Sequence, residues 1–518
     1  MKANPLRFTE KAIYILWGLC CSSVLVLDLF FSHVEYVCRQ DLINEWALLF
    51  LGLTGLGALC FAVFRLRKEQ EVSLRIPLFV SLVFLGFQII AVGSYYFITK
   101  WDVSQIIQYA IRVARGETIS LVYYSRYPNN LLLTRIFALI LRLCMAAGLN
   151  EDQAYAVIPM LQCLISVAAG LLTFTAVRDI TGDGRLALTA HGVFLLLIGV
   201  SPWVSVPYSD STGLAIPILI LRLSVLRPQT LKGNTLRWFA VGLLSIIGYR
   251  IKPTIVIVLP AICLVNAAAA FRSPDRKRLL ASAGACLAGL LIGYAAVEAA
   301  VSDLGRINKE ASFGPAHFLA MGLNTKTMGY YASEDVAYSA SFMTSEERTS
   351  ADLQLAEKRI RDMGVAGLSK HLGRKLLTDY NDGSFAWTME EVENGLFFFI
   401  VPEEPDPFFS PFIRSFYYSS GSRFGLFINF ETALWLAVLA MSLIAVFSRP
   451  GKNTAVVMLS VIGMFLYNLL FEARARYLYV FAPLYITLAA VGIGTVIERI
   501  RAAASKRGTH ADNPLEKA

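Results

Sequence analysis

Charged side chains are scarce in this sequence. Only 16% of its 518 residues are Asp, Glu, Lys or Arg, and 56% are hydrophobic, whereas a soluble globular chain has about 25% charged residues. The apolar residues form runs long enough to cross a hydrocarbon core of about 30 Å as helices. Because lipid offers backbone groups no hydrogen-bond partner, such runs must be helical. The shortage of charge therefore argues against a soluble protein and predicts an all-α polytopic membrane protein.

Cysteine and histidine patterns that would indicate a bonded framework or a metal site are also missing. The eight cysteines fall mostly within apolar runs, and the five histidines are scattered without ligand spacing. We therefore expect no disulfide framework and no required cofactor; a divalent metal is compatible with the sequence but is not indicated by it. No cleavage site follows Phe30-Phe31-Ser32, so the first apolar run is predicted to be a retained span.

The apolar runs predict twelve membrane spans, near 12–31, 45–64, 76–98, 154–177, 186–204, 211–227, 236–250, 253–272, 279–301, 426–447, 454–471 and 477–497. Lys2, Arg7 and Lys11 place the N-terminus in the cytoplasm by the positive-inside rule. Every connector that then falls on the cytoplasmic side is basic, including the tail from Arg499. The net charge of +9 thus reflects topology, and we expect no nucleic-acid partner.

The segment 131–148 is apolar but is not counted as a span. It contains Arg135 and Arg142, each of which costs about 2.5–3.5 kcal/mol at the centre of a spanning helix. A span here would also place the basic cluster Arg272–Arg278 outside. We expect an interfacial or re-entrant helix on the outer face. The chain then divides into an N-terminal two-span addition (1–75), a transmembrane core with outer loop 99–153 (76–301), a large extracytoplasmic region (302–425), three spans (426–498) and a cytoplasmic tail (499–518).

Charges pressed against span ends are the most informative, because desolvation makes them costly there. Asp102 follows the third span. It is either a solvated neighbour of a Trp in the interfacial belt or a general base held at the membrane boundary. The stretch 123–130 has two interpretations. It is either an aromatic surface turn with an Asn that caps the next helix, or a sugar-binding site in which aromatic rings stack on the sugar and amides bind its hydroxyls. Its candidate binding residues are Arg126, Tyr127, Asn129 and Asn130.

Two further clusters are predicted on the same face. Tyr208 and Asp210 precede a span, where Asp210 could also serve as a helix cap. Cations on the outer face run against positive-inside statistics and favour an anionic ligand, although snorkelling to lipid headgroups is the alternative. The residues of this cationic cluster are Arg250, Lys252, Glu472, Arg474, Arg476 and Tyr477.

This ordered set resembles bacterial multi-spanning glycosyltransferases of the GT-C superfamily, especially its family-39-like and protein-mannosyltransferase-like members. The resemblance covers span three through span nine and the last spans, and rests on Asp102, Tyr127-Pro128-Asn129-Asn130, Ser201-Pro202 with Tyr208 and Asp210, Lys252-Pro253, and Arg476-Tyr477. The stretch containing His317 and Asn324 is also similar to outer-loop sequences of such proteins, so both are candidate binding residues.

The resemblance implies an inverting transfer of a sugar from a polyprenyl-phosphate donor to an extracytoplasmic glycan, lipid or protein, with Asp102 as base and membrane lipids as further partners. Three spans precede Asp102, two more than in family members, which often carry the catalytic Asp after the first span; Asp210 or Glu35 is therefore an alternative base. Family members commonly have Lys-Pro-Pro at the outer turn where this chain has Tyr127-Pro128-Asn129-Asn130, so Arg126 is the nearest substitute for phosphate contact. A lipid-linked oligosaccharide polymerase or ligase, a flippase and a non-catalytic scaffold are rival functions.

Overall fold

The structure is a computed structural model, and it describes residues 5–31, 42–66, 72–95, 97–99, 101–270, 275–387, 397–399 and 409–511. Within these ranges the chain is helical apart from one two-stranded antiparallel ribbon, which pairs β1 (Phe97–Thr99) with β2 (Phe397–Phe399). The prediction of an all-α polytopic protein is confirmed. Glu35 and Cys38 lie outside the described residues.

Nine helices in the described ranges are long and apolar enough to cross a membrane. They correspond to nine of the predicted spans. The elements that form them are α1 (Pro5–Phe31), α2 (Glu45–Leu66), α3 (Arg75–Tyr95), α7 (Glu151–Thr181), η4 (Pro253–Ile257) with α12 (Val258–Ala270), α13 (Arg276–Val301), α19 (Phe424–Ile444), α20 (Lys452–Leu470) and α22 (Ala482–Ala511). Two of them, α7 and α13, start at side-chain caps; Asn150, for example, accepts from the backbone N–H of Gln153 at the start of α7.

The other three predicted spans are helical but are shorter or more polar. The first is α8 (Gly184–Phe194) followed by one π-helical turn, η2 (Leu195–Gly199). The second is divided into α9 (Ser209–Gly213) and α10 (Ala215–Val225), and the third is α11 (Leu231–Ile251). Helix α22 continues beyond the predicted span 477–497, to Ala511.

Glycines allow three pairs of membrane helices to approach closely. A Cβ atom at Gly242 of α11 would collide with the backbone of Cys286 in α13, and one at Gly52 of α2 would collide with the backbone of Ala433 in α19. Gly492 packs in the same way between α22 and α19. Small residues permit such contacts in lipid, where packing between backbones replaces the hydrophobic effect as the source of association.

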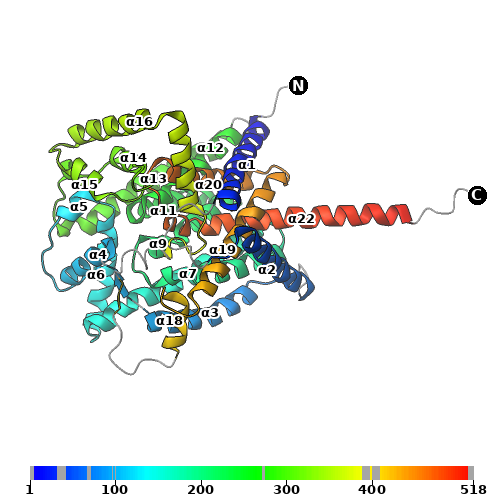
Figure 1. Ribbon diagram of the computed structural model, residues 1–518, viewed down its shortest axis with the longest axis horizontal. Coiled ribbons are helices and arrows are strands. Elements are labelled where there is room, and N and C mark those ends of the chain that lie inside the picture. Colours follow the sequence, from blue (N-terminus) through cyan, green and yellow to red (C-terminus); the bar gives the residue numbers. More distant parts are fainter. Residues whose placement is uncertain are drawn as a thin grey trace, which may run out of the picture.

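One end of the bundle carries most of the helices that do not span. From the segment predicted as the first outer loop come α4 (Asp102–Ala114), α5 (Val122–Arg126) and α6 (Asn130–Ala146). From the large region come η5 (Ser302–Leu304), η6 (Lys309–Ala311), α14 (Pro315–Gly322), α15 (Ser333–Ala340), α16 (Ser345–Tyr380) and α18 (Ser410–Tyr417). Figure 1 shows α4–α6 and α14–α16 gathered at the end away from the C-terminus.

The segment predicted as an interfacial helix forms α6, which has 17 residues and is not among the nine candidate spans of the described ranges. Its arginines reach the ends of neighbouring helices. Arg135 donates to the carbonyl of Ala300 at 2.7 Å, and Arg142 donates to the carbonyl of Val113 at 2.8 Å. These cations therefore bind carbonyls near the C-terminal ends of α13 and α4, where helix carbonyls lack partners.

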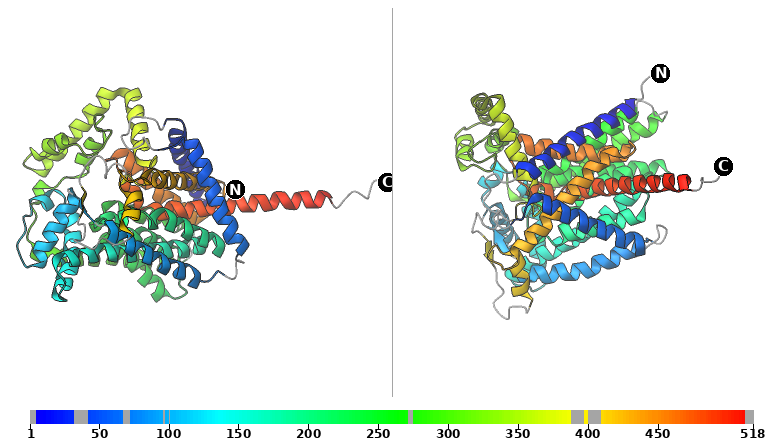
Figure 2. Two further views of the ribbon diagram at one scale, coloured as in Figure 1. Left: turned by 60° about the horizontal axis from the view of Figure 1, so that its bottom comes forward. Right: turned by 45° about the vertical axis from the view of Figure 1, so that its right-hand side comes forward.

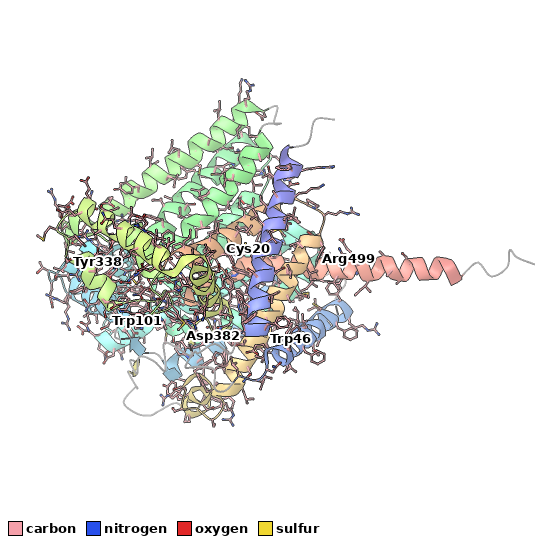
Figure 3. The ribbon with its side chains drawn as sticks, turned by 45° about the horizontal axis from the view of Figure 1, so that its top comes forward. Cys20, Trp46, Trp101, Tyr338, Asp382 and Arg499 are labelled. Carbon is pink, nitrogen blue, oxygen red and sulfur yellow. The ribbon has the colours of Figure 1, made fainter. Side chains whose placement is uncertain are left out.

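The two ends of the chain point the same way. In Figure 2 the spanning helices run towards the side where N and C lie, and the helices of the large region occupy the opposite side. Figure 3 shows the same separation for single residues, with Trp101 and Tyr338 at the end opposite Arg499.

Candidate functional site

The polar residues singled out by the sequence lie at helix ends, where the chain turns between longer helices. In chain order they are Asp102 at the start of α4, Tyr208 as the N-cap of α9, Lys252 as the C-cap of α11 and Arg476 at the start of α21 (Arg476–Tyr479). Helix ends leave backbone groups without intrahelical partners, so polar side chains are tolerated there.

Tyr208 joins Asp102 to Arg476. Its hydroxyl donates to Oδ2 of Asp102 at 2.8 Å, and its ring centroid lies 5.1 Å from the Arg476 guanidinium carbon. The Arg476 guanidinium carbon lies 4.2 Å from the ring centroid of Trp101. The rings of Trp101 and Tyr208 meet edge to face. Aromatic faces attract a cation through their quadrupoles. These four residues, called here the acid–arginine cluster (Trp101, Asp102, Tyr208 and Arg476), come from three distant parts of the chain.

A buried ion pair lies beside this cluster. Lys252 Nζ donates to Asp210 Oδ1 at 2.6 Å, with the two side chains 6% and 1% exposed. Nζ also lies 4.5 Å from the ring centroid of Tyr477. Burial lowers the pKa of the Lys252 ammonium, and the Asp210 carboxylate opposes that shift. The second oxygen of Asp210, Oδ2, is buried and has no hydrogen-bond partner within the described part of the chain.

The segment before α21 adds a carboxylate and a second arginine. Tyr477 donates to Oε2 of Glu472 at 3.2 Å. Burial raises the pKa of Glu472, while the charges of Arg474 and Arg476 lower it. The Arg474 guanidinium carbon lies 4.8 Å from the ring of Tyr330 in the large region. The structure therefore brings Glu472, Arg474, Arg476 and Tyr477 together, next to Lys252 and Asp210.

The predicted aromatic turn packs against the same region. Asn130 donates to the hydroxyl of Tyr123 at 2.6 Å, and Asn129 donates to Asn130 at 3.0 Å. Burial raises the pKa of Tyr123 well above its usual range, and the charge of Asp102 adds to that shift. Tyr127 meets the ring of Phe313 edge to face. The turn thus lies beside Asp102, although the amides of Asn129 and Asn130 are engaged with neighbours.

Arg126 also belongs to this turn, which places it near the candidate site. Its carbonyl accepts from the backbone N–H of Phe313 at 3.2 Å. Its charge lowers the pKa of Tyr127 and of Tyr331, and the Asp102 charge acts on both in the opposite sense to Arg126; in each case burial is the largest cause and raises the pKa. The charges of Arg126 and Asp102 therefore act on the same two tyrosines, Tyr127 and Tyr331.

Arg250 does not join the cationic group. It lies two residues before Lys252, but its guanidinium pairs with Glu298 of α13 at 3.0 Å. A two-residue step along a helix turns the side chain by about 200°, so Arg250 and Lys252 face different neighbours. Arg250 is thus a candidate binding residue from the sequence, and the structure does not place it with the other cations of the site.

His317 and Asn324 lie within the large region, in contacts of their own. His317 Nδ1 lies 2.7 Å from Ser339 Oγ, which donates to Asp352 at 2.7 Å. Burial lowers the pKa of His317 to about 4. Asn324 donates to Asp335 at 3.0 Å. These contacts connect α14, α15 and α16, so the structure gives both residues partners that hold the region together.

Two aromatic partners of the arginines, Trp101 and Tyr330, were not among the predicted site residues. Trp101 follows a span end, where a Trp is ordinarily part of the interfacial belt, and Tyr330 lies 144 residues before its partner Arg474 (474 − 330). Only tertiary packing shows that both rings face cations. The described residues bring no three His, Cys, Asp or Glu side chains into a metal-binding group.

Comparisons with known proteins define the family. No curated protein matches the sequence. A family model described as a conserved hypothetical integral membrane protein matches residues 47–496. This match covers both outer regions, the acid–arginine cluster and most of the membrane helices. The chain therefore belongs to this family of integral membrane proteins.

Proposed function

We propose that the protein transfers a sugar from a polyprenyl-phosphate donor to an acceptor hydroxyl at the membrane surface. The observation that carries the proposal is the joint contact of Tyr208 with Asp102 and Arg476. It places a carboxylate that can take a proton beside a cation that can stabilise a phosphate. The membrane helices offer apolar surface for the polyprenyl tail.

In the proposed reaction the acceptor oxygen attacks the anomeric carbon of the donor sugar. The bond from that carbon to the phosphate oxygen breaks, and the polyprenyl phosphate leaves with the bonding electrons. Asp102 takes the proton of the acceptor hydroxyl. The hydrogen bond from Tyr208 orients the Asp102 carboxylate. One displacement inverts the anomeric configuration.

Charge grows on the leaving phosphate as the bond breaks, so a fixed cation there stabilises the transition state more than the bound donor. Arg476 is the first candidate, because its guanidinium rests on two aromatic rings beside Asp102. Lys252 is already paired with Asp210. We therefore assign Lys252 the role of holding Asp210 and Tyr477 in place, and Arg476 the role of meeting the phosphate.

We further propose that both termini are cytoplasmic and that the site faces the outside. Basic connectors support this orientation, as does the separation of the termini from the large region in Figure 2.

The test uses the purified protein, radiolabelled polyprenyl-phosphate sugars and membrane extracts, with transferred label as the readout. Asp102→Asn should lower the rate about 10²–10⁴-fold, the usual contribution of a general base, and leave donor binding unchanged. Asp152→Asn is the matched control, because Asp152 is an exposed carboxylate in the first turn of α7. Full activity of the Asp102→Asn variant would exclude Asp102 as the base. Movement of an intact donor across a vesicle membrane, without transfer of label, would favour a flippase.

A further inference from the structure

Helix α16 carries two buried charges that none of the functional assignments uses. The helix bends at Gly364, which has φ 59° and ψ −177°, and Figure 1 shows its second part turning towards the bundle. On that second part, Lys375 and Asp379 are both 0% exposed. They lie four residues apart, on the same face of the helix. Lys370, one and a half turns earlier, is exposed.

Lys375 binds the end of a membrane helix. Its Nζ donates to the carbonyl of Leu469 at 3.0 Å and to that of Phe471 at 2.5 Å. Helix α20 ends at Leu470, so these oxygens are among the carbonyls that have no intrahelical partner. The negative end of the helix dipole also attracts a cation. Lys375 therefore fixes the point at which the chain leaves α20.

Three other contacts hold the next residues to the large region. Ala473 donates its backbone N–H to the carbonyl of Gly329 at 2.9 Å. A Cβ atom at Gly322 would collide with the carbonyl oxygen of Phe471, so the two backbones lie in direct contact. The ring of Tyr330 lies under Arg474. Residues 471–474 are thus held by loop 322–330 and by α16 together.

The segment held in this way leads straight into the candidate site. Glu472 accepts from Tyr477, and Arg476 follows two residues after Arg474. Segment 471–475 has no helix of its own, so its shape depends on the contacts around it. A shift at its start would move the Arg476 guanidinium relative to Trp101.

We propose that Lys375 is a positioning residue, which holds segment 471–476 through the end of α20 so that Arg474 and Arg476 face the donor phosphate. The role of the phosphate rests on the proposed function. Asp379 belongs to the same device, one helical turn beyond Lys375. Burial raises the pKa of Asp379 well above its usual range, and the charges of Lys375 and Arg474 oppose that rise. A large region outside the spans would then take part in donor binding without touching the donor.

An apolar side chain could fill the same space at lower desolvation cost, since buried charges are often no more stabilising than a hydrophobic replacement. A methionine at position 375 removes the two hydrogen bonds and keeps a side chain of similar length. An arginine keeps the donors. The exposed Lys370 supplies the matched control, because Lys370→Met removes the same charge from the same half of α16 without breaking a contact to α20.

The experiment compares the full-length wild-type protein with the Lys375→Met, Lys375→Arg and Lys370→Met variants in detergent micelles. Hydrogen–deuterium exchange of peptides covering 471–476 reports whether the segment is held. Binding of a polyprenyl phosphate without sugar reports whether the cations are placed. We expect Lys375→Met to speed exchange in this segment and to weaken phosphate binding about tenfold, the effect of losing hydrogen bonds from a charged donor. Lys375→Arg should lie closer to wild type, and Lys370→Met should match it.

Unchanged exchange in Lys375→Met would overturn the proposal. So would faster exchange with unchanged phosphate affinity, because the segment would then be held without any effect on the cations. Failure of the wild-type protein to bind polyprenyl phosphate would instead contradict the proposed function, and the exchange result would then decide alone whether Lys375 holds the segment. Loss of folding in Lys375→Met would show as faster exchange throughout the chain. The comparison of Lys375→Arg with wild type would then decide whether a donor at position 375 holds the segment.

Discussion

Lys252 and Asp210 show how single residues at this site depend on each other. Both side chains are almost fully removed from solvent, and each supplies the charge that the other needs. Removing one partner leaves an uncompensated buried charge, which is far more costly than the pair itself is stabilising. An exposed ion pair such as Lys326–Glu334, with side chains 77% and 54% exposed, lacks this property because water replaces the missing partner.

This contrast gives a prediction for stability. Lys252→Met should lower the free energy of unfolding by about 3–5 kcal/mol, measured by titrating the protein in mixed micelles with a denaturing detergent. Lys326→Met should change it by about 0–1 kcal/mol. Adding Asp210→Leu to Lys252→Met should restore part of the loss, because the unpaired carboxylate is then gone. Equal effects of the two lysine changes would show that the Lys252–Asp210 pair is not buried as described.

His317 gives a prediction for pH dependence. Burial lowers its pKa to about 4 in the folded protein, whereas an unfolded His titrates near 6.5. Below about pH 6.5 the unfolded chain therefore binds a proton that the folded chain does not, and stability falls as the pH drops towards 4. From pH 7 to pH 5 this His should remove about 1–2 kcal/mol. His317→Gln should show a correspondingly smaller fall in unfolding free energy, and an equal fall in both proteins would refute the assignment.

At the scale of helices, the long apolar runs were predictable because lipid leaves the backbone no choice. The spans 12–31 and 454–471, for example, are found as α1 and α20 with ends shifted by a few residues. The break between α9 and α10 was not predicted. Ser209–Gly213 packs its polar residues inside the protein, and hydropathy does not distinguish buried polar residues from exposed ones. Neighbours distant in sequence, such as Trp101 and Arg476, were beyond any periodicity argument.

Helix α16 bends at Gly364, and the sequence did not predict this bend. Nothing in the local sequence except Gly364 marks the bend, and the direction of the second half is decided by Lys375 binding α20. A Lys and an Asp four residues apart ordinarily indicate a solvated helix face. Burial of both at one position depends on tertiary contacts that a single sequence does not display.

Gly364 should therefore resist substitution. Its φ of 59° with ψ −177° lies in a region that is essentially restricted to glycine, and a Cβ there would meet no neighbouring atom. Gly364→Ala should lower the unfolding free energy by about 1–3 kcal/mol through backbone strain alone. Gly373, in the helical part that follows, is the control. A Cβ there would make only an ordinary contact with Leu27 Cδ2 at 3.8 Å, so Gly373→Ala should be neutral or slightly stabilising because alanine favours helix. A neutral Gly364→Ala would mean that α16 continues straight through this position.

At the scale of the whole molecule, the two chain ends and the large region occupy opposite ends of the bundle. This arrangement lets the site lie among outer helices while basic connectors stay with the termini. Under the proposed function it would also keep donor and acceptor on one side, since the acid–arginine cluster lies at the end where α14–α16 gather. The orientation of that end in the cell decides on which side of the membrane the cluster lies.

Cysteine labelling in intact cells tests the orientation. Val365 of α16 is 86% exposed, and Ala504 is exposed on the part of α22 near the C-terminus. If the termini are cytoplasmic, as the basic connectors indicate, Val365→Cys should react with a membrane-impermeant maleimide from outside, whereas Ala504→Cys should react only after permeabilisation. The chain without new cysteines measures labelling of its eight native ones. The reverse pattern would place Asp102 and Arg476 on the cytoplasmic side and exclude an extracytoplasmic acceptor, whatever the chemistry of the site.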